Sequence, residues 1–407
     1  MKFVISHPTG NANVRAIVMC LYKAGMLEKF FTTIACFENS EKLRRFLIKD
    51  LNRREFDEKL RPFTESYSWR EAGRHVFNKL GLSYFTNKES SAFGINTVYK
   101  SLDRYLARKL DAYPSIKAVY GYEDGSYYTF TSAKERGLQC VYELPIAYWE
   151  TARTLLTEEA ERWPGWKPTL KGGIADSKEK LQRKIIELEL SDTVITPSRF
   201  VAASLPGWAM QKRIIISPFG TPRFSNYDKK IHDRSIKKPL RILFAGSMSQ
   251  RKGLADLFEA IGLLNTNHIQ LIVLGSLLAP LQFYQKACPS FQYERPRVHT
   301  EVLELMETCD VLCLPSIVEG RALVMQEAMS RGLPLIVTPN TGGEDLIKEG
   351  ETGFLVPIRS PEAIAEKINW FLENRLLLGE MREAAFIHAS DYTWDKYGQT
   401  ILGAFKD

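Results

Sequence analysis

The sequence of 407 residues predicts two doubly wound α/β domains that face each other. At roughly 100 to 200 residues per domain, this length suits two domains, each with a core of its own. In both halves of the chain, short apolar runs alternate with segments of helical periodicity, which is the order of parallel α/β folds. A polar, basic stretch over residues 223–238 opens the second half. Ligands of such domains bind at the carboxyl ends of the strands, so we expect a binding site between the domains.

The first half begins with a strand, a polar loop and a helix that ends near Gly25. Its expected strands are continuous apolar runs, which are typical of strands buried on both faces of a parallel sheet. These runs span residues 3–5, 31–36, 118–120, 140–142 and 193–195. We expect this N-terminal domain to cover residues 1–210.

The second half repeats the pattern, and we expect its domain to cover residues 211–385. Its expected strands span residues 242–244, 271–274, 311–314, 335–337 and 354–356. A helix from Pro361 carries apolar residues at the spacing of one helical face. The alternation indicates a second parallel sheet covered by helices.

The net charge of +7 is unevenly distributed, because the first 300 residues are basic and the last 107 are acidic. Such asymmetry favours a partner that carries phosphate, or an anionic membrane surface. No helix-turn-helix, zinc-finger or RNP-type signature accompanies the basic residues, so we expect no nucleic acid partner. Six cysteines without a CxxC pair or a Cys/His cluster predict neither a metal site nor a disulfide framework.

The sequence also bears on the compartment. No segment has the roughly 18 apolar residues of a membrane span, and the apolar run near the N-terminus is too short for a secretory signal. We therefore expect a cytoplasmic protein. Residues 40–75 combine a helical apolar stripe with many basic residues. This segment is either an interfacial helix on anionic lipid, which would make the protein peripheral to a membrane, or a domain helix with a solvated basic face.

The first chemical motif lies where the strand at 242–244 ends, at Gly246. A short polar loop with Ser247 follows, and Arg251 and Lys252 open the next helix. The N–H groups and the dipole of a helix N-terminus favour an anion, and two cations can neutralise a diphosphate. The alternative is a glycine turn with exposed cations.

The second motif follows the strand at 311–314, where Glu319 and Glu327 stand eight positions apart. Carboxylates accept hydrogen bonds from paired sugar hydroxyls, so one carboxylate would suit each end of a nucleotide sugar. Two glutamates at this spacing are common by chance, but their place between a strand and an apolar helix strengthens the interpretation. Further along, Gly342 and Gly343 either let the backbone approach a ligand closely or serve tight turns.

In this order, the motifs resemble the donor-binding half of the retaining family-4 glycosyltransferases of GT-B fold, whose hallmark is a Glu-x7-Glu motif. The resemblance covers residues 240–358, whereas the first 190 residues match by architecture. It implies two facing Rossmann-like domains, with a final helix at about residues 386–407 that packs back on the N-terminal domain. It also implies transfer of a hexose from a nucleotide-diphosphate sugar, of unidentified base, to a hydroxyl of a glycan, a lipid-linked glycan or another glycoconjugate.

The resemblance also implies roles for the residues of a donor site. Lys252 would bind the diphosphate together with Arg251, Glu319 would orient the transferred sugar, and Glu327 would hold the ribose hydroxyls. Gly10, in the first N-terminal loop, would face the phosphates or the acceptor. The remaining donor-site positions lie in the two motifs, at Gly246, Ser247, Gly320, Arg321, Ala322, Leu323 and Val324.

Two positions depart from the pattern of the family. Ser247 stands where many relatives have an arginine, so Arg251 would supply the missing cation from the other end of the loop. Arg321 replaces an aromatic residue of the sugar loop, and it either recognises an unusual sugar or faces solvent. The chain has no Asp-x-Asp pattern. We therefore expect no metal and no cofactor, with cationic side chains and a helix N-terminus stabilising the leaving group.

The acceptor is expected to meet the N-terminal domain. The candidate acceptor residues follow its expected strands and are Asn11, Arg15, Glu123, Asp124, Glu143, Tyr148 and Trp149. His7, in the first loop, is either a general base or a hydrogen-bonding residue. The aromatic pair after Glu143 resembles a carbohydrate-contacting surface, and buried packing of both rings fits the sequence equally well.

Two other functions remain open from the sequence. Ser247 suggests a non-catalytic sugar-nucleotide-binding protein, whereas Lys252, Glu319 and Glu327 argue against it. A dinucleotide-dependent oxidoreductase loses ground, because no strand is followed by GxGxxG with a later acidic ribose ligand.

Overall fold

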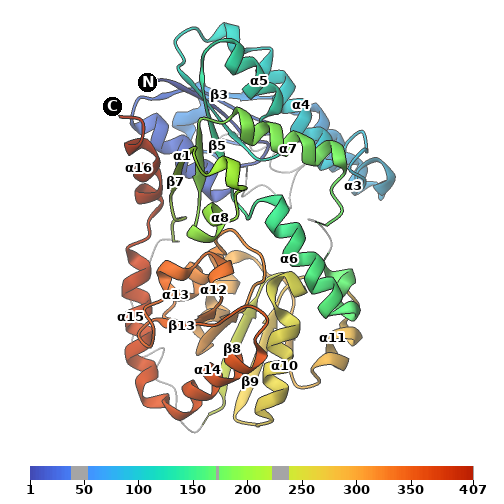
Figure 1. The fold of residues 1–407 in the computed structure, drawn as a ribbon, viewed down its shortest axis with the longest axis vertical. Helices are drawn as coiled ribbons and strands as arrows, with labels where there is room; N and C mark the ends of the chain where they lie inside the picture. Colours follow the sequence, from blue (N-terminus) through green and yellow to red (C-terminus); the bar gives the residue numbers. More distant parts are fainter. Residues whose placement is uncertain (38–53, 171–173, 222–237, 407) are drawn as a thin grey trace.

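The computed structural model describes residues 1–37, 54–170, 174–221 and 238–406, and it contains two parallel sheets flanked by helices (Figure 1). The two-domain α/β architecture predicted from the sequence is confirmed. Residues 38–53 lie outside the described ranges, so both alternatives for this part of the segment, an interfacial helix and a domain helix with a solvated basic face, stay predictions. Beyond them, the same segment forms η2 (Glu58–Phe63), β3 (Thr64–Ser66) and the start of α3 (Trp69–Lys79).

The N-terminal sheet has seven strands in the order β3-β2-β1-β4-β5-β6-β7. Besides β3, its strands are β1 (Phe3–Ser6), β2 (Leu27–Thr32), β4 (Ala118–Tyr122), β5 (Gln139–Glu143), β6 (Thr193–Thr196) and β7 (Arg213–Ile216). Besides α3, its helices are α1 (Ala12–Lys23), α4 (Ile95–Ala107), α5 (Tyr127–Glu135), α6 (Trp149–Arg162), α7 (Lys178–Leu190) and α8 (Arg199–Ala203). Helix α1 ends as expected, with Gly25 in the left-handed region at φ 66°.

Two details of this sheet differ from the expectation. The strand expected at 31–36 occupies Leu27–Thr32, because the half-buried Glu28 and Lys29 open it and hid its start from a search for apolar runs. Strand β7 pairs with β6 and so extends the N-terminal sheet past residue 210, where we expected the domain to end.

The C-terminal sheet has six strands in the order β10-β9-β8-β11-β12-β13. These are β8 (Leu240–Ala245), β9 (Ile269–Leu274), β10 (Gln292–Glu294), β11 (Val311–Leu314), β12 (Leu335–Val337) and β13 (Gly353–Leu355). Its helices are α10 (Leu254–Leu264), α11 (Leu281–Ala287), α12 (His299–Glu307), α13 (Leu323–Met329), α14 (Pro361–Glu373) and α15 (Leu378–Ser390), and α16 (Trp394–Gly403) ends the chain.

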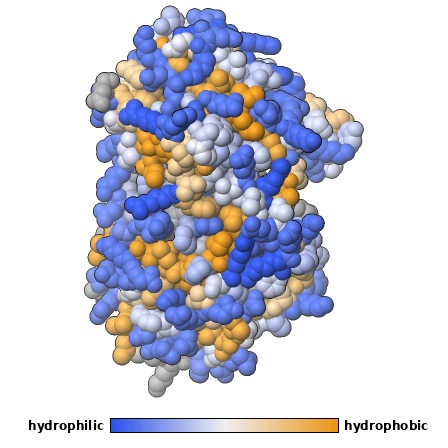
Figure 2. Space-filling view, in the orientation of Figure 1, coloured by the Kyte–Doolittle hydropathy of each residue, from blue (hydrophilic) through white to orange (hydrophobic). Residues whose placement is uncertain are grey.

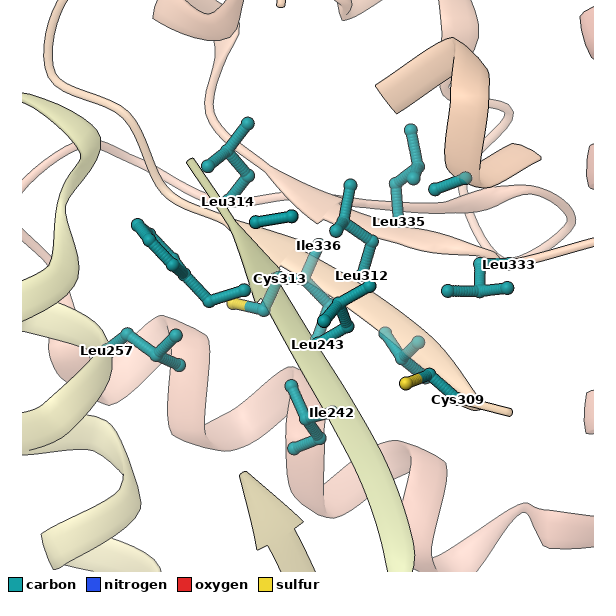
Figure 3. Packing of buried hydrophobic residues seen from close by; sticks show 14 of the residues in the cluster. Ile242, Leu243, Leu257, Cys309, Leu312, Cys313, Leu314, Leu333, Leu335 and Ile336 are labelled. Atoms are coloured by element: carbon teal, nitrogen blue, oxygen red, sulfur yellow. The ribbon is translucent and has the colours of Figure 1, made fainter. Parts of the chain in front are cut away.

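The core of the C-terminal domain lies around its central strands (Figure 3). Leu243 on β8 and Leu312 on β11 are fully buried on one face of the sheet, and Ile336 on β12 and Cys313 on β11 are fully buried on the other. Burial raises the pKa of the Cys313 thiol. All six cysteines are free and buried. Strands β8 and β11 pair in parallel, so the loops that follow them emerge together.

The α6–η5 segment, formed by α6 and η5 (Pro164–Thr169), joins the two domains. Figure 1 shows α6 running from the N-terminal domain down the flank of the C-terminal domain, beside α10. Trp166 of η5 is only 5% exposed and belongs to the C-terminal core. Its ring meets those of Phe258 and Phe283, with centroids 5.9 and 4.9 Å away. The segment is therefore shared between the domains, although it falls within the expected limits of the first.

A second crossing returns the chain to the N-terminal domain. Helix α15 packs in the C-terminal core, whereas α16 packs against α1 (Figure 1). The aromatic rings of Phe405 and Phe3 lie 5.3 Å apart, and Tyr397 is buried in the N-terminal core. The return therefore takes place between Ser390 and Trp394.

The surface of the molecule is mixed in character. On the face drawn in Figure 2, apolar patches are interspersed among hydrophilic side chains over both domains. None of the helices in the described part of the chain has both the length and the hydropathy of a membrane span.

Replacing Trp166 with alanine is expected to lower the free energy of unfolding by about 3–5 kcal/mol, because a large ring leaves a buried site between three aromatic residues. Chemical denaturation followed by circular dichroism measures this change. Trp208→Ala removes a ring that is 42% exposed and serves as the matched control. Equal stability of the two variants would contradict the role of Trp166.

Candidate functional site

The phosphate loop, defined as residues 246–253, leads from the carboxyl end of β8 through η7 (Gln250–Lys252) to α10. Gly253 adopts φ 72°, and a Cβ at this position would collide with the carbonyl oxygen of Pro315. This close approach brings the loop against the chain that leaves β11. Lys252, the residue before Gly253, is 8% exposed.

Three of the predicted donor-site residues converge at this junction. Lys252 Nζ lies 2.6 Å from Glu319 Oε1, and the Arg251 guanidinium pairs with the same oxygen. Arg251 also donates to the Val318 carbonyl at 3.1 Å. Burial and the nearby Arg251 lower the pKa of Lys252, whereas Glu319 opposes the shift. The junction therefore holds two cations on one carboxylate in a largely desolvated place.

The sugar loop, defined as residues 319–322, touches the N-terminal domain. Ser198 Oγ donates to the Gly320 carbonyl at 2.7 Å, and a Cβ on Gly320 would collide with the Pro145 carbonyl. Gly342 packs against the opposite side of Gly320 at φ 72°, where a Cβ would meet the Gly320 carbonyl. Gly320 and Gly342 thus allow backbone to approach backbone where the domains meet.

The position of Arg321 excludes one of the two alternatives predicted from the sequence. Its side chain is buried, donating from Nε to Gln326 Oε1 at 2.9 Å and pairing with Asp345 at 2.6 Å. The guanidinium also lies 4.9 Å from the ring centroid of Tyr392. The expectation that it faces solvent is wrong, because these partners replace its hydration. They also direct it away from Glu319, toward Asp345 and the chain before α16.

The second glutamate of the motif lies on α13. Glu327 Oε1 is 3.1 Å from Nε2 of His299, at the start of α12. The Glu327 side chain is 18% exposed and the His299 side chain 56%. Leu323 and Val324 open α13 and are half-buried, as is Ser247 in the phosphate loop. Arg251 is engaged by Glu319, and it lies at the opposite end of the loop from Ser247.

A buried polar network anchors the phosphate loop to the α6–η5 segment. Gln250 Nε2 donates to Glu159 Oε2 at 2.7 Å and to Asp256 Oδ2 at 2.8 Å, and all three side chains are buried. Arg359 and Arg162 neutralise the carboxylates, with nitrogen–oxygen distances of 2.5 Å to Glu159 and Asp256 respectively. Because Gln250 directly precedes Arg251 and Lys252, this network fixes the position of both cations.

Four of the predicted residues gather in the N-terminal domain, in a cavity of about 250 Å³ that we call the N-terminal pocket. The pocket is lined by His7, Asn11, Asn13, Ile95, Asn96, Tyr99, Tyr122, Glu123, Asp124, Pro145 and Lys180. His7, Asn11, Glu123 and Asp124 are the predicted members. Pro145, which touches the sugar loop, belongs to the lining, so the pocket adjoins the junction of the two domains.

His7 is held as a neutral ring. Its Nδ1 lies 2.5 Å from the Thr9 carbonyl oxygen, and Tyr122 packs edge-on with ring centroids 4.6 Å apart. Burial lowers the pKa of His7 to about 4, with Arg54 adding to the shift. A ring that stays neutral near pH 7 accepts or donates hydrogen bonds there but carries no charge.

Other predicted acceptor residues lie outside this pocket. Glu143 is 1% exposed and accepts hydrogen bonds from Asn13, Tyr120 and Tyr397, at 2.7, 2.6 and 3.0 Å. The expectation that Glu143 contacts the acceptor is wrong, because its buried carboxylate instead forms hydrogen bonds that link α16 to the sheet. Tyr148 is likewise fully buried, so its ring packs in the core.

The remaining predicted acceptor residues and Gly10 do not line the pocket. Trp149 is half-buried at the start of α6, with the Arg153 guanidinium 5.3 Å from its ring centroid. Arg15 bonds the Gly10 carbonyl, and Gly10 is buried. Sequence reasoning missed Asn96, Tyr99 and Lys180, which lie on helices, because only the loops after the strands were searched.

Comparison with known proteins identifies the C-terminal half. Residues 227–388 match the family model described as glycosyl transferases group 1. Among curated proteins, the D-inositol 3-phosphate glycosyltransferase of Paenarthrobacter aurescens (strain TC1) is 25% identical over 213 residues, which are 48% of this chain and 52% of that protein. Spore coat protein SA of Bacillus subtilis (strain 168) is 28% identical over 188 residues, 40% of this chain and 48% of that protein. The chain thus matches about half the length of these relatives.

Similar solved structures cover the whole chain. Sucrose-phosphate synthase from Thermosynechococcus elongatus aligns with a TM-score of 0.63 at 16% identity, covering 100% of this chain and 98% of that chain. Anabaena HepE, solved in complex with UDP and glucose, aligns with a TM-score of 0.58 at 14% identity and covers 100% of both chains. These alignments show that the fold is GT-B.

The pKa of His299 depends on its contact with Glu327 and can be measured. The Glu327 carboxylate raises the pKa of His299 above its ordinary value of 6.5. The pairing therefore stabilises the folded protein below about pH 6.5 and is lost as the pH rises through the raised pKa. We expect Glu327→Gln to lower the His299 pKa, as followed by NMR of the imidazole ring. Glu304→Gln, an exposed change on the same helix as His299, should leave it in place. A His299 pKa indifferent to Glu327→Gln would contradict the contact.

Proposed function

Residues 227–388 belong to the group 1 glycosyl transferases, and from this premise we propose that the protein transfers a sugar from a nucleoside diphosphate sugar to an acceptor hydroxyl. The acceptor would be a carbohydrate or a lipid-linked carbohydrate. The observation that carries the proposal is the meeting of Lys252, Arg251 and Glu319 at the carboxyl ends of neighbouring strands. Strand ends of this kind are where open α/β sheets bind their ligands.

On binding, the donor would replace Glu319 as the partner of Lys252 and Arg251. Its diphosphate presents several anionic oxygens, so it competes with the carboxylate for Lys252 and Arg251. Once released from the cations, Glu319 is placed to accept hydrogen bonds from hydroxyls of the transferred sugar. Glu327 and His299, on α13 and α12, would meet the nucleoside.

The transfer would proceed with retention at the anomeric carbon. The bond from that carbon to the diphosphate oxygen breaks, and the acceptor oxygen forms its bond on the same face. The acceptor proton passes to the departing diphosphate. Lys252 and Arg251 would stabilise the developing negative charge, which supports a metal-independent step in a chain that has no Asp-x-Asp pattern.

A donor panel tests the activity. We expect the full chain to bind one nucleotide among UDP, GDP and ADP, and to hydrolyse or transfer from the corresponding sugar nucleotide. UDP-glucose is the first donor to try, because a structural neighbour was solved with UDP and glucose. Calorimetry measures nucleotide binding, and radiolabelled donor measures turnover. Tight binding without turnover for any donor would favour a non-catalytic sugar-nucleotide-binding protein instead.

Replacing Lys252 with methionine is expected to weaken nucleotide diphosphate binding about 10- to 100-fold, because a charge-assisted hydrogen bond contributes about 1.5–3 kcal/mol. Isothermal titration calorimetry with the nucleotide found in the panel gives the change. Lys286→Met removes an exposed lysine of α11 and is the control. If both variants bind like the parent, Lys252 does not contact the donor.

A further inference from the structure

The N-terminal pocket displays two carboxylates on a rigid turn. Asp124 lies in the left-handed region at φ 72°, which side chains other than glycine seldom adopt. Buried Glu187 holds the turn by accepting from the backbone N–H of Asp124 at 2.8 Å and of Ser126 at 3.0 Å. Non-glycine residues are kept in such conformations where the surroundings over-determine them, often at ligand sites. Glu123 and Asp124 are therefore presented in a fixed geometry.

The cations around this turn are occupied by carboxylates. Lys180 Nζ lies 2.9 Å from Asp176 and 3.4 Å from Asp124. Lys184 Nζ lies 3.2 Å from Glu123 and 3.4 Å from Asp176.

Two further basic residues lie beside the pocket, Arg183 and His7. Arg183 donates to Asn96 Oδ1 at 2.6 Å and lies 3.4 Å from Asp124. His7 stays neutral near pH 7, because burial lowers its pKa to about 4. Lys180, Arg183 and Lys184 are thus each paired with at least one carboxylate. A phosphate entering here would face two carboxylates without a cation reserved for it.

The lining suits hydroxyl groups. Carboxylates accept from pairs of hydroxyls, and the amide of Asn11 both donates and accepts. Tyr122 is 3% exposed and its ring lines the pocket, whereas its hydroxyl lies against the buried Glu143 carboxylate. Ile95 and Tyr99 add apolar surface for the C–H faces of a ring.

The size of the pocket limits its ligand. A volume of about 250 Å³ lies just below the 300–1,000 Å³ common for sites that hold drug-sized ligands. It therefore suits one sugar or cyclitol ring.

On the premise of the glycosyltransferase function proposed above, we infer that the acceptor presents an uncharged polyol ring, without a phosphate group, to the N-terminal pocket. Glu123 and Asp124 bind its hydroxyls. This differs from the substrate in the printed name of the inositol-phosphate relatives, whose matches lie within at most about half of their length.

Matched pairs of ligands test this inference without requiring turnover. The probes are myo-inositol, glucose and galactose, each beside its phosphate monoester, and binding to the full chain is measured by saturation-transfer difference NMR. We expect at least one free polyol to bind, and its phosphate monoester to bind at least ten-fold more weakly. Tighter binding of the monoesters, or no binding of any polyol, would overturn the inference.

Variants place the binding at the turn. Asp124→Asn keeps a residue that tolerates the left-handed region and removes the charge, so polyol binding should fall at least five-fold. Glu123→Gln is the second variant to measure if Asp124→Asn unfolds at a lower temperature than the parent. Glu135→Gln, an exposed change on α5, is the control and should bind like the parent. Binding that survives both Asp124→Asn and Glu123→Gln would remove the carboxylates from the site.

The donor panel separates this inference from the proposed function. If a sugar nucleotide is turned over but phosphorylated acceptors are preferred, the pocket chemistry is wrong and the activity stands. If polyols bind through Asp124 but no sugar nucleotide binds, the activity is wrong and the polyol site stands.

Discussion

The burial of two carboxylates beside the phosphate loop is the constraint on which the site depends. Glu159 comes from α6 and Asp256 from α10, and neither could be buried without Gln250 and two arginines to satisfy it. The partners come from both halves of the chain, so the loop that bears Lys252 is positioned by the junction of the domains. Trp166 adds the apolar part of the same attachment. Lys252 and Arg251 are thus placed by interactions that only the assembled molecule provides.

The sequence was a good guide wherever a strand is buried on both faces. Parallel strands such as β8 and β11 are continuous apolar runs, and their adjacency explains why Lys252 and Glu319 meet. Strands β3 and β10, with the sequences TES and QYE, lie at sheet edges and carry no apolar pattern that a search could find. Each of these strands forms by pairing with its neighbour in the sheet, and the periodicity of the sequence does not reveal such pairing.

The errors at the candidate site share one physical cause. Glu143 ends β5 and Arg321 lies in the loop after β11, at the ligand edge of each sheet, yet both are buried and matched by distant partners. Tyr397 lies 254 positions from Glu143, and Tyr392 lies 71 positions from Arg321. No local pattern encodes such partners. His7 and Asp124 were found because the loop after a strand in a parallel sheet opens toward the ligand edge whatever the rest of the chain does.

The return of α16 to the N-terminal domain bears on how the protein is made. Tyr397, Ile401 and Phe405 are part of the N-terminal core, and Tyr397 supplies a hydrogen bond to buried Glu143. During synthesis, the strands of the first domain leave the ribosome long before these residues do. The first domain therefore lacks the helix that packs on α1, and one hydrogen bond to Glu143, until the whole second domain has been translated. The chain completes its first-made domain last.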